Sequence, residues 1–190
     1  MRQRLLGAGF IVVLLAVAAP ARAADDYAID GMHSGVTFKI QHLGLAWVHG
    51  RFDDFAGGFT LDADDAGKCL FGLSIKAETI DTNNTKRDDH LRSPDFFNAK
   101  QFPAISFKST AVKAIKDGYE VTGDLTLHGV TKPLTFKLQG GKKAEFPKGV
   151  QRTGFSAELT IKRSDFGMDK FAEALSDEVV IAISFEGTKK

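Results

Sequence analysis

Apolar and polar residues alternate with a period of two along most of this chain. Val36, Phe38 and Ile40 alternate with Thr37 and Lys39, which places three apolar side chains on one face of a strand. One polar and one apolar face favour antiparallel pairing. Because few segments are helical enough to cover the apolar faces, the sheet is expected to close on itself as a barrel or a sandwich. The pattern predicts eight strands, at residues 35–42, 47–61, 69–77, 104–115, 118–127, 132–140, 152–163 and 178–188.

Two connections interrupt the alternation. Residues 78–103 are too many for a plain loop, so a short helix is predicted at Lys86–Leu91, capped by Asn83 or Asn84 and ended by Pro94. In residues 163–177, the stretch Met168–Leu175 is predicted to form one or two further helical turns. Both connections are candidates for covering a barrel mouth. Elsewhere Lys116-Asp117-Gly118 and His128-Gly129 predict tight turns between strands.

The first 23 residues have the composition of a secretory signal. Arg2 and Arg4 precede an apolar run from Leu5 to Ala19, and Ala21-Arg22-Ala23 has the small-x-small form of a cleavage site. The run is shorter than the roughly 20 apolar residues of a membrane span, so no stable membrane insertion is expected. We predict cleavage after Ala23 and a single domain at residues 24–190, located in the periplasm, with secretion as the alternative.

The composition argues against nucleic acid as a partner and against stabilisation by an internal disulfide. Removing the leader takes away three of the 25 basic residues and none of the 24 acidic ones, which leaves a net charge near −2. Without a dense basic stripe, nucleic acid is not an expected partner. Cys69 is the only cysteine, so the chain has no internal disulfide. Its apolar strand context favours a small core residue over a reactive thiol, without settling its reactivity.

The histidines and serines show no catalytic or metal-binding signature. No two of the five histidines have the spacing of a metal-ligand pair on a strand or a helix. Ser34 beside His33, and Ser164 beside Asp165, lack a nucleophile elbow or any triad signature. We therefore expect no catalytic residues, no metal site and no enzymatic activity. The five histidines are His33, His42, His49, His90 and His128.

Several motifs together resemble the YceI family of exported polyisoprenoid-binding proteins. The longest are Ile80–Phe97 and Gly123–Pro133, and the resemblance covers nearly all of the chain after the leader. It implies an eight-stranded antiparallel β-barrel, lipocalin-like in outline, that carries a long isoprenoid chain in its interior and catalyses nothing. Shorter matching motifs are His33-Ser34, Ile40–Gly44, Phe102-Pro103, Phe107–Thr110 and Arg163–Met168.

An eight-stranded barrel has an interior that is either filled by side chains or wide enough for one small ligand. The alternation looks the same in both cases, and the resemblance favours the ligand. The chain's Phe-rich inner face suits an alkene-bearing tail and an ordinary core equally well. The predicted lipid-binding residues of the inner face are Phe38, Ile40, Phe52, Phe59, Leu73, Ile75, Phe107, Leu125, Leu127, Phe136, Phe155, Leu159, Ile181 and Ile183.

A head-group rim is predicted at Arg87, Arg92 and Lys132. A guanidinium fork at the mouth would suit the anionic or polar head of an amphiphile. The competing interpretation is structural, with these side chains fixing the connections to strand ends, and the sequence favours it.

The leading functional prediction is binding, with transport or storage, of a long isoprenoid or similar amphipathic lipid in the periplasm. That lipid is the expected partner, and no other cofactor is expected. Two alternatives stay open: an accessory protein or enzyme acting on a quinone-like lipid, and a structural barrel filled by its own side chains. The oligomeric state is also open, and a homodimer is one candidate.

Overall fold

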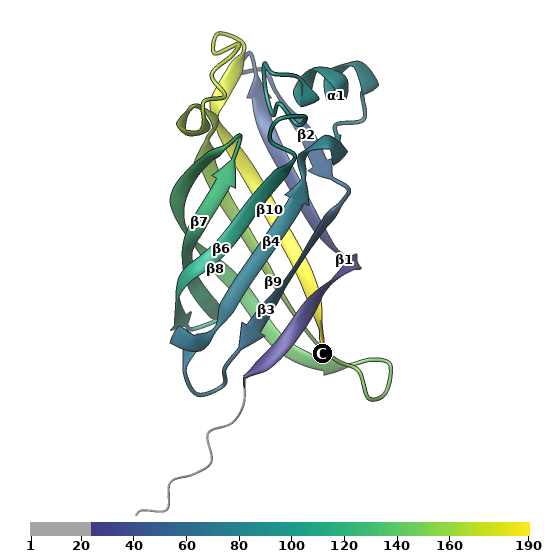
Figure 1. The fold of residues 1–190 in the computed structure, drawn as a ribbon, viewed down its shortest axis with the longest axis vertical. Coiled ribbons are helices and arrows are strands. Elements are labelled where there is room, and N and C mark those ends of the chain that lie inside the picture. The colour runs from purple at the N-terminus through teal and green to yellow at the C-terminus, as the bar shows by residue number, and fades with distance from the viewer. Residues whose placement is uncertain (1–23) are drawn as a thin grey trace, which may run out of the picture.

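The computed structural model of the protein describes residues 24–190 (Figure 1). The predicted signal segment, residues 1–23, lies outside the described residues. Most of the described chain is β-structure, with one α-helix, α1 (Thr85–Arg92). The ten strands are β1 (Asp25–His42), β2 (Ala46–Phe52), β3 (Phe55–Leu61), β4 (Leu70–Lys76), β5 (Ile80–Asp81), β6 (Ala104–Ile115), β7 (Gly118–Leu127), β8 (Val130–Glu145), β9 (Gln151–Lys162) and β10 (Leu175–Lys189).

The wall is a closed antiparallel barrel of eight strands, as predicted. Neighbours follow the order β10-β9-β8-β7-β6-β4-β3-β1, and β1 pairs with β10 to close the ring. The predicted strand at 47–61 is divided at Asp53 and Asp54 into β2 and β3. The Asp53 amide donates a hydrogen bond to the Thr79 carbonyl, and the Asp54 amide donates one to the Thr79 hydroxyl. Both amides are therefore lost from the hydrogen bonding between strands. Each half pairs with a different half of β1, and β5 adds to β2.

Strand β1 begins ten residues earlier than predicted. Its first part pairs with both neighbours, Tyr27 lying opposite Phe59 on β3 and opposite Lys189 on β10. The register shifts between Asp30 and Gly35. This bulge interrupts the alternation, which is why the pattern alone did not extend the strand toward the N-terminus.

The structure confirms the predicted turn at His128-Gly129 and the predicted helix α1. His128 and Gly129 both have positive φ, 52° and 76°, as a two-residue hairpin turn of type I′ requires. Helix α1 begins after Asn84, whose side chain accepts a hydrogen bond from the amide of Arg87 at 3.1 Å, and it ends at Arg92, with Ser93 as the C-cap before Pro94.

The second predicted helix, Met168–Leu175, is wrong. A short 3₁₀ helix occupies Arg163–Phe166, and Gly167 ends it with φ 72°. The carbonyls of Met168 and Lys170 then accept hydrogen bonds from the Arg163 side chain. These two carbonyls therefore accept hydrogen bonds from a side chain and not from backbone amides of a helix.

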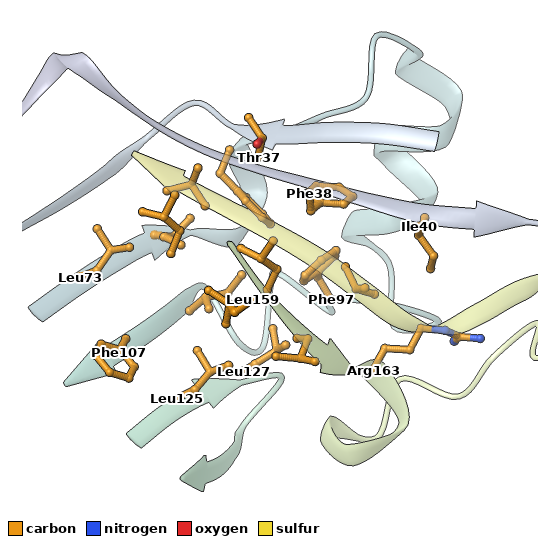
Figure 2. Close-up of a pocket in the computed structure, with 18 of the residues that line it drawn as sticks. Thr37, Phe38, Ile40, Leu73, Phe97, Phe107, Leu125, Leu127, Leu159 and Arg163 are labelled. Atoms are coloured by element: carbon orange, nitrogen blue, oxygen red, sulfur yellow. The ribbon is translucent and has the colours of Figure 1, made fainter. Parts of the chain in front are cut away.

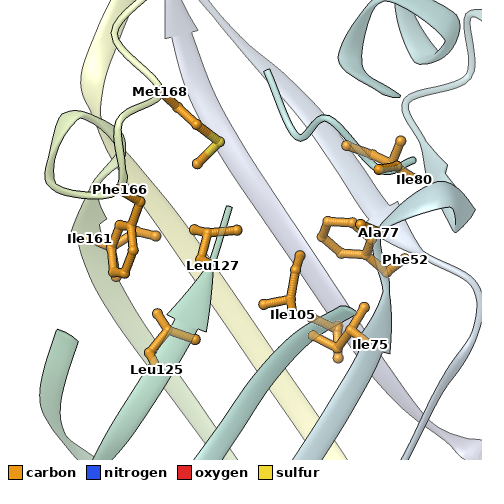
Figure 3. Packing of buried hydrophobic residues seen from close by; sticks show 12 residues of the cluster. Phe52, Ile75, Ala77, Ile80, Ile105, Leu125, Leu127, Ile161, Phe166 and Met168 are labelled. Atoms are coloured by element: carbon orange, nitrogen blue, oxygen red, sulfur yellow. The ribbon is translucent and has the colours of Figure 1, made fainter. Parts of the chain in front are cut away.

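Buried apolar residues form two clusters at different depths of the barrel. The cluster nearer α1 joins Phe52, Ile80 and Leu127 to Phe166 and Met168 of the second connection (Figure 3). The other contains Tyr27, Phe59, Phe71 and Phe155. Within residues 24–190, no helix has the length and apolar character needed to cross a membrane.

Candidate lipid-binding cavity

A cavity of about 540 Å³ occupies the barrel interior. All eight strands of the wall contribute to its lining, and most of the lining side chains are apolar. Figure 2 shows Phe38, Leu73, Leu127 and Leu159 directed into the same space from different strands. The volume lies within the range of about 300–1,000 Å³ that is typical of small-molecule sites.

Thirteen of the fourteen predicted inner-face residues line this cavity. Many of them are only half-buried, among them Leu73, Leu159 and Ile181, although their side chains point inward. An inward apolar side chain stays accessible when the space before it is empty, so these residues border a cavity instead of filling a core. The thirteen are Phe38, Ile40, Phe52, Phe59, Leu73, Ile75, Phe107, Leu125, Leu127, Phe136, Leu159, Ile181 and Ile183.

Phe155 points inward but does not line the cavity. Its ring meets Phe59 and Phe71 edge-on, with ring centroids 5.6 and 5.7 Å apart. Tyr27 stacks on Phe59 at 4.9 Å, and Phe185 packs against Phe155 at 5.8 Å. These aromatic rings pack together as the floor of the cavity, so Phe155 belongs to the floor and not to the cavity wall.

The only cysteine of the sequence, Cys69, is buried among the residues of the floor. Cys69 is fully buried in the cluster that contains Phe59 and Phe155. Its sulfur accepts a hydrogen bond from the amide of Asp62 at 3.3 Å. Burial raises the pKa of the nearby Tyr119 hydroxyl, and contact with Cys69 raises it further. These contacts match the interpretation of Cys69 as a small core residue.

The mouth lies at the opposite end, between the two long connections. Lining residues there include His90 and Leu91 of α1, Phe97 after it, and Phe171 and Leu175 of the second connection. Phe171 stacks on Phe96, and His90 meets Phe171 edge-on at 5.6 Å. The two connections that the sequence singled out therefore meet over the mouth, through aromatic contacts that the alternation could not reveal.

Of the three predicted rim residues, only Arg87 lines the cavity. Its Nε donates to the hydroxyl of Thr82 at 2.7 Å and its Nη2 to the Thr82 carbonyl at 2.6 Å. Thr82 is itself held by the buried carboxylate of Asp88, which accepts from its amide at 2.9 Å. Arg87 makes no ion pair within residues 24–190, and its side chain is exposed at the mouth.

Arg92 and Lys132 lie outside the cavity lining. The guanidinium of Arg92 donates to the carbonyls of Glu78 and Ile80, at 2.6 and 3.0 Å, and pairs with Asp89. Lys132 lies 3.8 Å from Asp165. Arg92 therefore performs the structural role that the sequence favoured, since it fixes the start of the first connection to α1.

Arg163 is the main site residue that sequence reasoning missed. It lines the cavity mouth, only 4% of it is exposed, and Figure 2 shows its guanidinium directed away from the apolar side chains. The guanidinium donates to two carbonyls of the second connection, Met168 at 2.6 Å and Lys170 at 2.8 Å, and to two at the start of β10, Ser176 at 3.0 Å and Leu175 at 3.3 Å. It thus holds this connection in place over the barrel.

Asp177 interacts with this clamp through its charge. A hydrogen bond from the amide of Ser164 holds the pKa of Asp177 below its usual value, and the Ser164 hydroxyl and the charge of Arg163 lower it further. The amide bond measures 2.9 Å and the hydroxyl bond 2.8 Å. The ionised carboxylate therefore fixes the start of the 3₁₀ helix that carries Arg163.

The histidines are dispersed. His33 contacts Asp30 at 2.9 Å, His90 contacts Asp95 at 3.0 Å, and the His128 ring contacts the Phe166 carbonyl at 3.0 Å. Within residues 24–190, no group of three or more His, Cys, Asp or Glu side chains is placed to hold a metal ion.

The architecture defines a class: closed antiparallel β-barrels of lipocalin-like outline, with an apolar cavity that has a floor at one end and a mouth at the other. Comparison with known proteins narrows this class. The YceI-like domain matches residues 27–187. Protein YceI of Escherichia coli O6:H1 is 42% identical over the full length of both chains. The chain therefore belongs to the YceI family.

Solved structures share the fold. The BcnA protein of Burkholderia cenocepacia superposes with a TM-score of 0.75 at 25% identity, covering 83% of this chain and 98% of that one. A domain from Saccharophagus degradans, described as a polyisoprenoid binding domain implicated in plant cell wall breakdown, gives a TM-score of 0.65 at 18% identity, covering 86% and 98%. At that identity the likeness concerns the fold alone.

Proposed function

We propose that this protein is an exported carrier that binds a long isoprenoid or similar amphipathic lipid inside its barrel, without catalysing a reaction on it. The observation that carries the proposal is the apolar cavity of about 540 Å³, bordered by inward side chains that are only half-buried. A barrel filled by its own side chains would leave no such volume, because protein interiors are close-packed.

The shape of the cavity favours a long tail with one polar end. Packed aromatic rings form the floor, and polar lining side chains that include Thr82, Arg87 and His90 lie at the mouth. A tail can enter the apolar interior while its head stays at the mouth in contact with these groups. The name of the Saccharophagus degradans neighbour, a polyisoprenoid binding domain, supports an isoprenoid as the tail.

The cavity is smaller than a long polyisoprenoid. If each methylene-sized group occupies about 30 Å³, which is the share of one water in the liquid, about 540 Å³ accommodates roughly 18 such groups, or three to four isoprene units. A longer tail has to project from the mouth. Selectivity should therefore rest on the apolar, flexible character of the tail more than on its full length.

The leader supports a periplasmic site of action. Residues 1–23 carry the charge, apolar run and cleavage pattern of a secretory signal. A carrier in the aqueous space between two membranes would shield a tail that water does not dissolve. Intact-mass analysis of the exported protein should show Ala24 as its first residue, and retention of residues 1–23 in a membrane fraction would contradict the export proposal.

Mass spectrometry of a gentle organic extract tests the binding proposal. Protein purified after export should release a lipid with an isoprenoid tail, in an amount near one molecule per barrel. The variant Leu159→Gln places an amide in the cavity wall and should carry much less, whereas Thr160→Gln, on the outer face of the same strand, should carry the normal amount. An empty barrel in protein that binds no added prenyl lipid would overturn the proposal.

A further inference from the structure

The β1–β2 hairpin exposes apolar side chains beside the cavity mouth. Its turn consists of Leu43, Gly44 and Leu45, and the two leucines are 55% and 83% exposed. The amide of Leu43 donates to the carbonyl of Ala174 at 2.7 Å, and Ala174 lines the cavity. The turn is therefore fixed to the rim of the mouth, at the same end of the barrel as α1 (Figure 1).

Two aromatic residues extend this surface. Trp47 on β2 is 44% exposed, and Phe171 on the second connection is 42% exposed while also lining the cavity. Leu43, Leu45, Trp47 and Phe171 are named here the mouth tip. Phe171 belongs to the mouth tip and to the cavity lining, so the mouth tip is continuous with the apolar cavity wall.

The charge of the hairpin differs from that of the rest of the protein. From Gly35 to Phe52 the sequence has Lys39 and Arg51 and no Asp or Glu, although the chain after its leader is slightly acidic. Arg51 pairs with Asp53 and Asp81, so its charge is compensated locally. The Lys39 ammonium lies 5.2 Å from the centre of the Trp47 ring, and Lys39 makes no ion pair within residues 24–190. A tryptophan beside a lysine with a free ammonium suits the boundary between lipid tails and head groups.

We infer that the mouth tip docks on the surface of a lipid bilayer containing anionic lipids. This inference rests on the proposed function, because a tail that passes between a bilayer and the cavity would otherwise cross water. The leucines and rings would enter the boundary region, Lys39 would face the head groups, and the mouth would open onto the lipid phase.

A second copy of the chain fits this surface less well. Four side chains of these exposures present on the order of 400 Å² of apolar surface. A standard protein interface needs about 800 Å² from each partner. Bilayer docking needs no matching surface and can be weak and reversible, as a carrier requires.

Trp47 allows a direct measurement because it is the only tryptophan in the sequence. Protein purified after export is mixed with vesicles of equal parts phosphatidylethanolamine and phosphatidylglycerol that contain no prenyl lipid. We expect the protein to float with the vesicles and the Trp47 emission to shift to shorter wavelength. Absence of both effects would overturn the docking inference.

A matched pair of variants separates the mouth tip from general surface hydrophobicity. Leu43→Asn with Leu45→Ser removes two apolar side chains, and Asn suits the positive φ of 53° at position 43. Met32→Ser with Leu70→Ser removes two strongly exposed apolar side chains that line no part of the cavity. The vesicle-bound fraction should fall at least about tenfold in the first variant and stay unchanged in the second. Equal losses in both would overturn the inference.

Two further readouts complete the test. If light scattering shows a dimer without vesicles that Leu43→Asn with Leu45→Ser converts to a monomer, the mouth tip covers a second copy and bilayer docking is overturned. Prenyl lipid delivered from cyclodextrin, with no vesicle present, should bind the wild type and the mouth-tip variant equally. If neither protein binds the prenyl lipid, the carrier function is contradicted. If both bind the prenyl lipid but the wild type does not float with vesicles, only the docking inference is overturned.

Discussion

Phe171 stacks on Phe96 with ring centroids 5.7 Å apart and ring planes inclined by 15°. The contact joins residues that are 75 positions apart in the chain and belong to the two connections over the mouth. His90 adds an edge-on contact to each ring, at 5.1 and 5.6 Å. These rings partly close the mouth, and a bound tail has to pass them when it leaves.

Replacing Phe171 with Ala should accelerate lipid release. An aromatic pair contributes about 0.5–1.5 kcal/mol beyond area burial, so its loss should raise the dissociation rate roughly 2- to 10-fold. Stopped-flow release of a fluorescent prenyl analogue measures this rate. Phe146→Ala serves as the control, because Phe146 is exposed in the loop between β8 and β9 and lines no part of the cavity. Identical rates in both variants would show that the aromatic contact does not restrict release.

Ligand-induced stabilisation should depend on the inner face alone. A prenyl lipid at about 100 times its Kd should stabilise the folded protein by about 2.7 kcal/mol, a rise in melting temperature of roughly 5–10 °C. Leu159→Gln should remove most of this rise, since an amide would face the tail without a hydrogen-bond partner. Thermal denaturation of delipidated protein with and without the lipid provides the measurement.

Thr160→Gln is the matched control, because Thr160 is exposed and follows Leu159 on the same strand. Its melting temperature should rise with lipid as in the wild type. If the two folded variants respond alike, the lipid does not occupy the cavity that Leu159 lines.

The inner face could be predicted because alternation is a local property of each strand. Once Leu159 faces inward, the period of two also places Phe155, Ala157 and Ile161 inward. Depth along the barrel axis is not local. It depends on how eight strands are staggered when the ring closes, so the sequence could not separate the floor residue Phe155 from the wall residue Leu159.

The mouth was less predictable because its contacts join distant segments. The alternation of the predicted strand 152–163, continued to its last residue, places Arg163 on the inner face, but the alternation does not show which groups accept hydrogen bonds from its guanidinium. Its four carbonyl partners lie 5 to 13 residues further on, in the irregular connection and at the start of β10. The same hydrogen bonds explain why Met168–Leu175 is not a helix.

Arg163→Met should destabilise the protein strongly. The substitution leaves several carbonyls of the second connection without donors, and each hydrogen bond to a charged group contributes about 1.5–3 kcal/mol, so a loss of about 3 kcal/mol or more is expected. Urea denaturation followed by circular dichroism measures the change. Lys162→Met, at the exposed last residue of β9, should change stability little. A loss below about 1 kcal/mol for Arg163→Met would show that the clamp contributes little to the fold.

Acid should weaken the attachment of β9 to the β1 bulge. Arg152 Nη1 donates to Asp30 at 2.6 Å, and this bond, followed by that with His33, holds the pKa of Asp30 well below its usual range. Because the folded-state pKa lies below the unfolded value of about 3.9, the stabilisation is present above that pH and is lost as the pH falls toward the folded-state pKa.

Asp30→Asn should therefore lower the melting temperature at neutral pH and make it less dependent on pH below about 4. Thermal denaturation at a series of pH values tests this. Asp64→Asn, which replaces an exposed carboxylate in the connection between β3 and β4, should keep the wild-type profile. A wild-type profile for Asp30→Asn would mean that other carboxylates govern the acid transition.

Affinity should increase with tail length only until the cavity is filled. A cavity of about 540 Å³ holds roughly three to four isoprene units at about 30 Å³ for each methylene-sized group. Each buried methylene contributes up to about 0.8 kcal/mol, so adding a unit within this range should tighten Kd by at least about tenfold. Units beyond the fourth project from the mouth and should change Kd by less than about twofold. Titration of a series of prenyl alcohols of increasing length measures this dependence.

Leu73→Phe reduces the free volume, because Leu73 is half-buried and lines the cavity, and it should move the plateau to a shorter tail. A Kd that keeps tightening well beyond four units, or a plateau that Leu73→Phe leaves in place, would show that the cavity volume does not determine tail selection.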